Sequence, residues 1–254
     1  MLRLVTIPIS HYCEKARWGL DLCGRPYVEE AHVQMLHWPH VLWAGRTKLA
    51  PVLVDGATSV CDSSEILRYL ADRCAPLSSL YPEEHREAIV ALEARLDAFG
   101  RQTRRLFYEA LTGASRDDLI GYNCHGVPAW ESKTLHVLAP LFARFATRYL
   151  EVSPETVDVA HRDIGAMLDE IEERLSDGRP YLFGETFTAA DLSFAALSAP
   201  ISFPPGYGVP IPSRAEILEI APQAGRYWKR RGVEHAVSMY RRHRLPADAP
   251  ARAV

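Results

Sequence analysis

Hydrophobic residues recur with two different periods in residues 1–75, which predicts a domain that mixes strands and helices. Residues 2–8 form a short apolar, β-branched run that is typical of a strand. The apolar residues that follow are spaced as on one face of a helix, and Gly24 is a natural residue to end it. These helical positions are Tyr12, Ala16, Leu20 and Cys23.

The remainder of this region predicts three more strands and a second helix. Asp55-Gly56 is a strong hairpin signal, because this dipeptide suits the tight turn between two antiparallel strands. Residues 37–45 are rich in tryptophan and look irregular. The predicted order β-α-β-(α)-β-β-α is that of a compact α/β domain with a mixed sheet. The predicted strands cover residues 26–32, 52–54 and 58–61, and the helix covers residues 62–73.

The pattern changes at residues 76–82, a stretch of proline and serine that we interpret as a linker. From residue 83 to residue 245 the apolar periodicity is almost entirely helical, which predicts an all-α domain. Thr188 and Asp191 fit the two ends of a capping box, so a helix is expected to begin there. Phe187 and Leu192 would flank it as a hydrophobic staple.

The last part of the chain contains three segments that differ in composition and periodicity. Residues 203–213 contain four prolines and predict a stiff loop. Residues 222–243 are basic and helical in pattern, and we interpret their positive charge as a solvated helix face. The segment 246–254 is expected to be disordered.

Charge and cysteine content exclude several classes of function. The net charge is −3, from 29 basic and 32 acidic residues, which disfavours a general nucleic-acid binder. No apolar run approaches the length of a membrane span, and no signal peptide is expected. The five cysteines are scattered without a C-x-x-C pair. This pattern gives little support to a zinc finger or a disulfide framework and favours a reducing cytoplasm.

Three segments, in this order and spacing, resemble the soluble glutathione transferase family. They are Ser10-His-Tyr-Cys-Glu-Lys-Ala-Arg17, Ala50-Pro-Val-Leu-Val54 and Val60-Cys-Asp-Ser-Ser-Glu-Ile-Leu-Arg-Tyr-Leu70. The capping element at Thr188–Asp191 resembles one in the same family's helical domain. The resemblance implies a thioredoxin-like domain over residues 1–75 that binds glutathione, followed by an all-helical domain over residues 83–245 that forms the electrophile pocket. It also implies a homodimer that conjugates glutathione, as co-substrate, to a small hydrophobic electrophile in detoxification.

Two residues are candidates for activating the glutathione thiol. An alkyl thiol has a pKa of about 8.5, so a hydroxyl donor and a helix N-terminus are needed to favour the thiolate near neutral pH. The resemblance places Ser10 where such a donor acts, and Cys13 is the alternative, as a mixed-disulfide nucleophile. Either residue has an ordinary structural interpretation as well, Ser10 as a helix cap and Cys13 as an apolar filler. Tyr12 is expected to pack in the core.

The resemblance assigns glutathione-binding roles to five further residues. Ala50 and Pro51 are expected to form a cis peptide whose backbone pairs with the cysteinyl part of glutathione. Asp62 and Ser63 open a helix, where free N–H groups and a hydroxyl suit the γ-glutamyl carboxylate and an acidic side chain suits its ammonium. Lys48 is placed to meet the glycyl carboxylate.

Other polar clusters carry weaker expectations. Arg101, Arg104 and Arg105 lie on the helix that lines the second-substrate pocket in this family, and would favour acidic electrophiles unless they form a solvated face or an intersubunit ion pair. His37-Trp-Pro-His40 has no third ligand in view, so no metal site is expected. Three functions remain open from the sequence: a transferase, a thiol oxidoreductase that uses Cys13, and a non-catalytic binding module.

Overall fold

The N-terminal region has the predicted order of strands and helices. The computed structural model describes residues 1–110, 115–244 and 252–253. Its first domain runs βαβαββα, with α2 taking the place of the stretch that looked irregular. Pro39 lies in the first turn of α2, where a missing N–H is tolerated. The elements are β1 (Leu2–Thr6), α1 (His11–Cys23), β2 (Tyr27–Ala31), α2 (Trp38–Gly45), β3 (Val52–Asp55), β4 (Thr58–Cys61) and α3 (Ser63–Ala71).

The sheet is mixed, and side-chain alternation along its strands decides which helix covers which face. β1 pairs with β2 in parallel and with β3 in antiparallel fashion, and β3 and β4 form the predicted hairpin. Leu4 and its partner Leu53 join the core formed with α1 and α3. The next pair, Val5 and Val52, belongs to a second core with α2. Because neighbouring residues of a strand face opposite ways, the domain has three layers.

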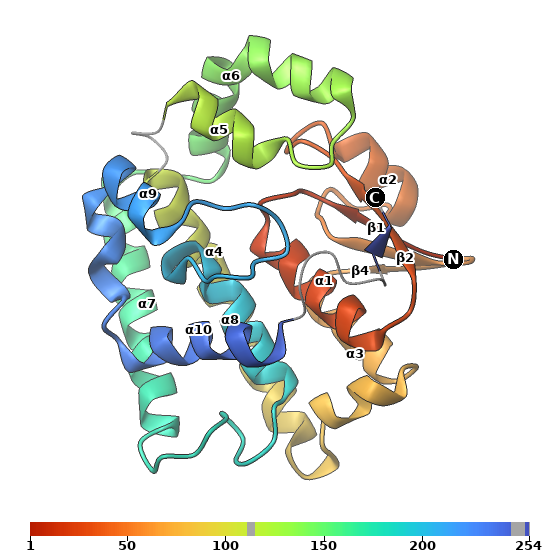
Figure 1. Cartoon of the computed structure of the whole chain (residues 1–254), viewed down its shortest axis with the longest axis vertical. Helices are drawn as coiled ribbons and strands as arrows, with labels where there is room; N and C mark the ends of the chain where they lie inside the picture. Colours follow the sequence, from red (N-terminus) through yellow and green to blue (C-terminus); the bar gives the residue numbers. More distant parts are fainter. Residues whose placement is uncertain (111–114, 245–251, 254) are drawn as a thin grey trace.

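The rest of the chain forms a helical domain around the long helices α4, α7, α8 and α10 (Figure 1). α8 lies at the centre and nearly all of its residues are buried, as its alanine-rich composition allows. Asp191 of α8 accepts hydrogen bonds from the Thr188 N–H (3.0 Å) and hydroxyl (2.8 Å), so the helix begins at the predicted cap. The helices are α4 (Arg86–Ala110), α5 (Arg116–Asn123), α6 (Ala129–Tyr149), α7 (Pro154–Arg174), α8 (Ala189–Ser202), α9 (Arg214–Ile220) and α10 (Arg231–His243).

Several boundaries differ from the expectation. The proposed linker 76–82 lies largely within a 3₁₀ helix, η1 (Ala75–Leu80), because Leu77 and Leu80 are buried against the first domain. The single basic helix expected at 222–243 is divided into η4 (Pro222–Tyr227) and α10. The division is stabilised from outside, since Arg230 just before α10 pairs with Glu172 of α7 at 2.8 Å.

The expected disorder of the tail is corrected at two residues. Arg252–Ala253 forms β5, which extends the sheet alongside β2 and gives the order β4-β3-β1-β2-β5. The remainder of the expected tail, residues 246–251 and 254, lies outside the described part of the chain. Within the described ranges, no helix combines the length and apolarity required to cross a bilayer.

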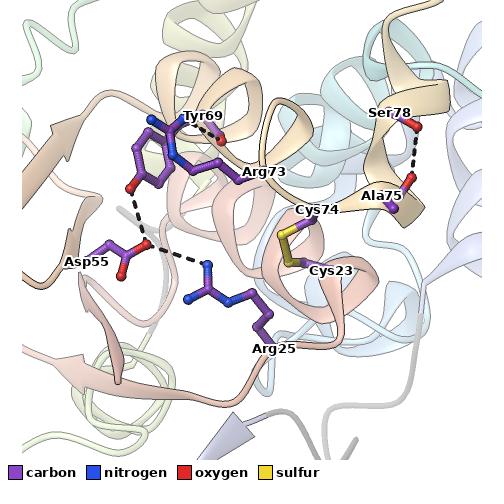
Figure 2. Close-up of a disulfide and its surroundings, with 8 residues drawn as sticks. All are labelled: Cys23, Arg25, Asp55, Tyr69, Arg73, Cys74, Ala75 and Ser78. Carbon is purple, nitrogen blue, oxygen red and sulfur yellow. Dashed lines mark hydrogen bonds and ion pairs between the residues drawn. A yellow bond between two sulfur atoms is a disulfide. The ribbon is translucent and has the colours of Figure 1, made fainter.

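The interpretation of the cysteines is also corrected, because Cys23 and Cys74 form a disulfide (Figure 2). Cys23 ends α1 and Cys74 follows α3, and the parallel packing of these helices brings together two residues that are 51 positions apart. Next to the bridge, the Asp55 carboxylate accepts a hydrogen bond from the Tyr69 hydroxyl at 3.1 Å. The bridge therefore joins the two helices at the end opposite to Ser10. Cys13, Cys61 and Cys124 are free thiols.

A buried ion pair connects the two domains. Lys15 of α1 lies 2.9 Å from Glu93 of α4, and both side chains are fully buried. The Glu93 carboxylate also accepts hydrogen bonds from Tyr81 (2.8 Å) and Ser193 (2.9 Å). A buried ion pair is stable only when its remaining polar atoms are satisfied in this way. The network fixes α1, and with it the start of α1, relative to α4.

Candidate functional site

Ser10 occupies the N-cap of α1, where β1 gives way to the helix. Its backbone is extended (φ −69°, ψ 122°), and its Oγ accepts a hydrogen bond from the Cys13 N–H at 3.4 Å. The hydroxyl hydrogen has no acceptor among the described residues, so it remains able to donate. Ser10 is half-buried and lines a cavity between the domains. The positive end of the α1 dipole lies at the same place, and this combination suits an anion such as a thiolate.

Cys13 lies one turn further along α1 and faces the interior. Its side chain is fully buried, and its Sγ accepts a hydrogen bond from the Ile7 N–H at 3.4 Å. Burial raises the pKa of this thiol, although Arg17 nearby opposes the shift. A nucleophilic cysteine needs the reverse, which is an accessible sulfur with a lowered pKa. The geometry of Cys13 is that of a packing residue.

Tyr12 points away from the cavity toward α4. Its hydroxyl donates to the Asp97 carbonyl oxygen at 2.8 Å, and burial raises the pKa of Tyr12 to about 12. The approach depends on Gly100, since a Cβ at that position would come within 2.9 Å of the Tyr12 oxygen. Tyr12 therefore packs between the domains.

The Ala50-Pro51 peptide is cis, in agreement with the expectation. Ala50 lies just before the β1–β3 ladder, whose first pair on this strand is Val52. The preceding loop is anchored by the buried His37, whose Nε2 lies 3.2 Å from the Lys48 carbonyl oxygen. Burial lowers the pKa of His37 to about 4, so the ring is neutral and donates from Nε2. The Lys48 side chain is exposed.

Asp62 and Ser63 lie at the start of α3. Asp62 has a positive φ of 77° and caps the helix, because its Oδ1 accepts from the Ser64 N–H at 2.8 Å and the Glu65 N–H at 3.3 Å. A non-glycine residue in this conformation is strained, and such strain concentrates at functional sites. The Ser63 Oγ is buried without a hydrogen-bond partner among the described residues. An unpaired buried hydroxyl is costly, which suggests a partner that arrives with a ligand.

Ser64 holds this helix start against the domain interface. The Lys15 ammonium donates to the Ser64 hydroxyl at 2.5 Å, and that hydroxyl donates to Asp97 of α4 at 3.0 Å. The position of Asp62 and Ser63 thus depends on the same buried network that joins α1 to α4. Sequence reasoning did not identify Ser64 or Lys15, because their importance comes from contacts across the interface.

The cavity beside Ser10 is formed by both domains. The first domain contributes the segment from β1 into the start of α1 and Gln34 after β2, and α4, α8 and the loop after α8 contribute the remainder. Most of the lining is apolar, and it contains no aspartate or glutamate. Tyr207 and Ile211 of the loop 203–213 line the cavity, and the Tyr207 hydroxyl donates to the Ile9 carbonyl oxygen of the first domain at 3.1 Å. The residues that sequence reasoning missed here include His11, Gln34, Phe107, Phe203, Tyr207 and Ile211.

His40 and His37 do not share a site. His40 instead stacks on His32 with ring centroids 3.5 Å apart, and Glu131 of α6 lies beside them. Both oxygens of Glu131 are already used, one 2.7 Å from His32 Nδ1 and the other 2.7 Å from the Val33 N–H. The rings are within 19° of parallel, so their in-plane lone pairs do not converge on one ion. This triad ties the end of β2 to α6.

Two family models match the chain over the regions that build this site. A glutathione S-transferase N-terminal domain model matches residues 4–77, and a glutathione S-transferase C-terminal domain model matches residues 154–218. The chain belongs to the glutathione S-transferase family. No curated protein sequence matches this glutathione S-transferase family member.

Solved structures of glutathione S-transferases share this family member's fold. One from Ceriporiopsis subvermispora, in complex with glutathione, has a TM-score of 0.60 at 15% identity, and the match covers 98% of this chain and 99% of that one. Glutathione transferase F2 from Populus trichocarpa has a TM-score of 0.57 at 18% identity, covering 95% and 99%. Glutathione S-transferase III in its apo form has a TM-score of 0.57 at 20% identity, covering 96% and 98%. Since identity is low, the similarity concerns the fold.

Proposed function

We propose that this glutathione S-transferase family member conjugates the thiolate of glutathione to a small hydrophobic electrophile. The observation that carries the proposal is the position of Ser10. Its hydroxyl lies at the N-terminus of α1, on the wall of the interdomain cavity, with its hydrogen available to donate. A hydrogen bond from Ser10 to the glutathione sulfur would favour the thiolate over the thiol.

Glutathione would lie across the ends of β3, α1 and α3. The backbone of Ala50, set by the cis bond to Pro51, would pair with the cysteinyl part. The Ser63 hydroxyl and the N-terminus of α3 would accommodate the γ-glutamyl carboxylate, and Asp62 the ammonium. Lys48 would meet the glycyl carboxylate. Two similar structures, from Ceriporiopsis subvermispora and Methylobacillus flagellatus, were solved with glutathione bound, which supports this choice of co-substrate.

The reaction needs little more than a stabilised thiolate near an electrophile. The thiol loses its proton to solvent, and Ser10 stabilises the sulfur anion. The anion then attacks the electrophilic carbon, and a carbon–sulfur bond forms. Either a leaving group departs with its bonding electrons, or a double bond opens and its other carbon takes a proton from solvent. Lowering the pKa of the thiol increases the fraction of nucleophile near neutral pH, which is the chief catalytic contribution.

The two alternatives differ in what they require of the chain. A thiol oxidoreductase that uses Cys13 needs an accessible sulfur, and the burial of Cys13 argues against it. A non-catalytic binding module needs no activated thiol. In such a module the thiol of bound glutathione would keep the pKa of free glutathione, whereas in a transferase that pKa would be lowered.

Assembly and location are part of the same proposal. A homodimer is the assembly that membership of this family favours, and light scattering tests it. A role in detoxification in the cytoplasm follows from the proposed chemistry. The free thiols Cys13, Cys61 and Cys124 suit a reducing compartment, whereas the Cys23–Cys74 bridge is more typical of an oxidising one.

The direct test is the ultraviolet absorbance of the thiolate, measured against pH for glutathione bound to the protein. The proposal predicts a pKa for the bound thiol at least one unit below the usual value of about 8.5. Ser10→Ala would bring the pKa back toward that value. A bound thiol that titrates like free glutathione in both proteins would overturn the proposal and favour the binding module.

A further inference from the structure

We infer that Arg104 selects electrophiles that carry a carboxylate, so the second substrate is an apolar acid. This inference rests on the proposed conjugation and names the substrate class of the same cavity. Arg101, Arg104 and Arg105 are neighbours on α4 but have different surroundings.

The three arginines differ in their exposure and in their hydrogen-bond partners. Arg101 is exposed to solvent. Arg105 is satisfied by protein groups, since it donates to the Gln102 side-chain oxygen at 2.5 Å and lies 3.7 Å from Glu151. Arg104 is half-buried and lines the cavity beside Ser10, and it forms no hydrogen bond or salt bridge with any described residue. A half-buried guanidinium that lines a cavity and has no acceptor among the described residues offers its donors to an anion that enters there.

The surroundings of Arg104 supply no negative charge. Among the described residues, the cavity lining contains no aspartate or glutamate, and Arg104 is the one permanently charged group in it. Its Cζ lies 6.0 Å from the centre of the Tyr12 ring, which supports the cation without neutralising it. His11, also in the lining, stays neutral because burial, and then the nearby Arg104, lower its pKa to about 3. Its Nε2 donates to the Gly100 carbonyl oxygen at 2.9 Å.

The remainder of the lining suits the apolar body of the substrate. Ile9, Phe107, Phe203 and Ile211 provide aliphatic and aromatic surface around Arg104. The hydroxyl of Tyr108 is already committed, because it donates to the Gln34 side-chain oxygen. A carboxylate is the anion that matches the planar fork of a guanidinium, and an aromatic ring is the body that matches this surface.

A chloronitrobenzoate and its methyl ester form a pair of probes with the same ring, nitro group and leaving group, and only the acid carries a negative charge. The effect of each substitution is therefore compared on each probe separately. With either, the glutathione thiolate attacks the ring carbon that bears chlorine. The carbon–sulfur bond forms, the carbon–chlorine bond breaks and chloride leaves, while the thiol proton goes to buffer. We expect Arg104→Met to lower kcat/KM for the acid by about tenfold or more and to leave the ester within about twofold. Arg104→Lys should keep part of the preference.

Arg101→Met is the matched control, because Arg101 lies on the same helix outside the cavity. It should leave both probes unchanged. An equal loss of both probes in Arg104→Met, or no loss of either, would overturn the inference. If the wild-type protein converts neither probe, the proposed function fails separately. Calorimetric binding of the chloronitrobenzoate to the wild type and to Arg104→Met then tests the anion site alone, and equal binding by both would reject it.

Discussion

The N–H of Cys13 donates to the Ser10 hydroxyl oxygen across 3.4 Å, so the two candidates for thiol chemistry are joined but face opposite ways. Ser10 lines the interdomain cavity, while the Cys13 sulfur lies in the core. Within one turn of α1, a hydroxyl that faces the cavity is thus separated from a thiol that serves packing.

Replacing each residue in turn tests this division. Ser10→Ala removes the donor to the glutathione sulfur, and we expect kcat/KM to fall by about tenfold to a hundredfold, as when one charge-assisted hydrogen bond is lost. Cys13→Ala should retain activity within about threefold, at some cost in stability from the lost packing. Initial rates near neutral pH with an activated chloronitrobenzene measure both. Disulfide reduction with glutathione tests the oxidoreductase separately: such an activity, lost in Cys13→Ala and kept in Ser10→Ala, would support the oxidoreductase instead.

Ser63 offers a test of ligand binding that separates function from folding. Its buried hydroxyl has no partner among the described residues, so Ser63→Ala should leave the free energy of unfolding unchanged or slightly raised. The same variant should weaken glutathione binding by about tenfold, because the ligand carboxylate loses a hydrogen bond. Calorimetry and urea denaturation give the two readouts. A large loss of stability with unchanged affinity would show that the hydroxyl serves only the fold.

His11 predicts how stability depends on pH. Burial, followed by the nearby Arg104, lowers the pKa of His11 from 6.5 to about 3. Between these values the unfolded chain takes up a proton that the folded chain does not, so the free energy of unfolding falls as pH falls. The loss from His11 alone is about 2 kcal/mol between pH 7 and pH 5.

His11→Gln is the variant that isolates this effect, since glutamine keeps a donor near the Gly100 carbonyl and has no proton to gain. Urea denaturation at several pH values should show a shallower loss for His11→Gln than for the wild type. His37, whose pKa is also lowered by burial, contributes equally to both proteins and cancels in the comparison. Identical slopes for the two proteins would mean that His11 is not buried as described.

The Cys23–Cys74 disulfide closes a loop of 51 residues and should stabilise the first domain. Cys23→Ala/Cys74→Ala is expected to lower the free energy of unfolding by about 2–4 kcal/mol, chiefly because the unfolded chain is no longer constrained. Glutathione affinity should be unchanged, since Cys23 ends α1 and Ser10 caps the opposite end of that helix. A reductant should destabilise the wild type and leave the double variant unaffected. No effect on either would show that the bridge does not form in solution.

Local patterns were sufficient to predict most of the fold. The alternation of Leu4 and Val5 in β1, the Asp55-Gly56 turn and the Thr188–Asp191 cap depend on residues that are near one another in sequence. The predicted order allowed for a helix between the second and third strands, but the pattern did not locate α2 within residues 37–45, because its proline and tryptophans obscure a short helix. The division before α10 was not predicted, because it depends on the ion pair between Arg230 and Glu172, and these residues are far apart in the sequence.

Only those parts of the candidate site that lie within a short sequence motif could be predicted. Ser10, the cis Ala50-Pro51 bond and the cap at Asp62 follow from short segments. The unpaired state of Arg104 could not be predicted, because it depends on which acids fold near it. The Cys23–Cys74 bridge escaped for the same reason, since its two cysteines meet only when α1 and α3 pack together.

The most direct test of the central claim is a calorimetric titration of the purified protein with reduced glutathione. The account predicts saturable binding with one glutathione per chain, because Ala50, Asp62 and Ser63 form one site in each chain. No binding up to millimolar glutathione, from protein shown to be folded, would contradict the transferase function and leave a binding module with this fold as the better description.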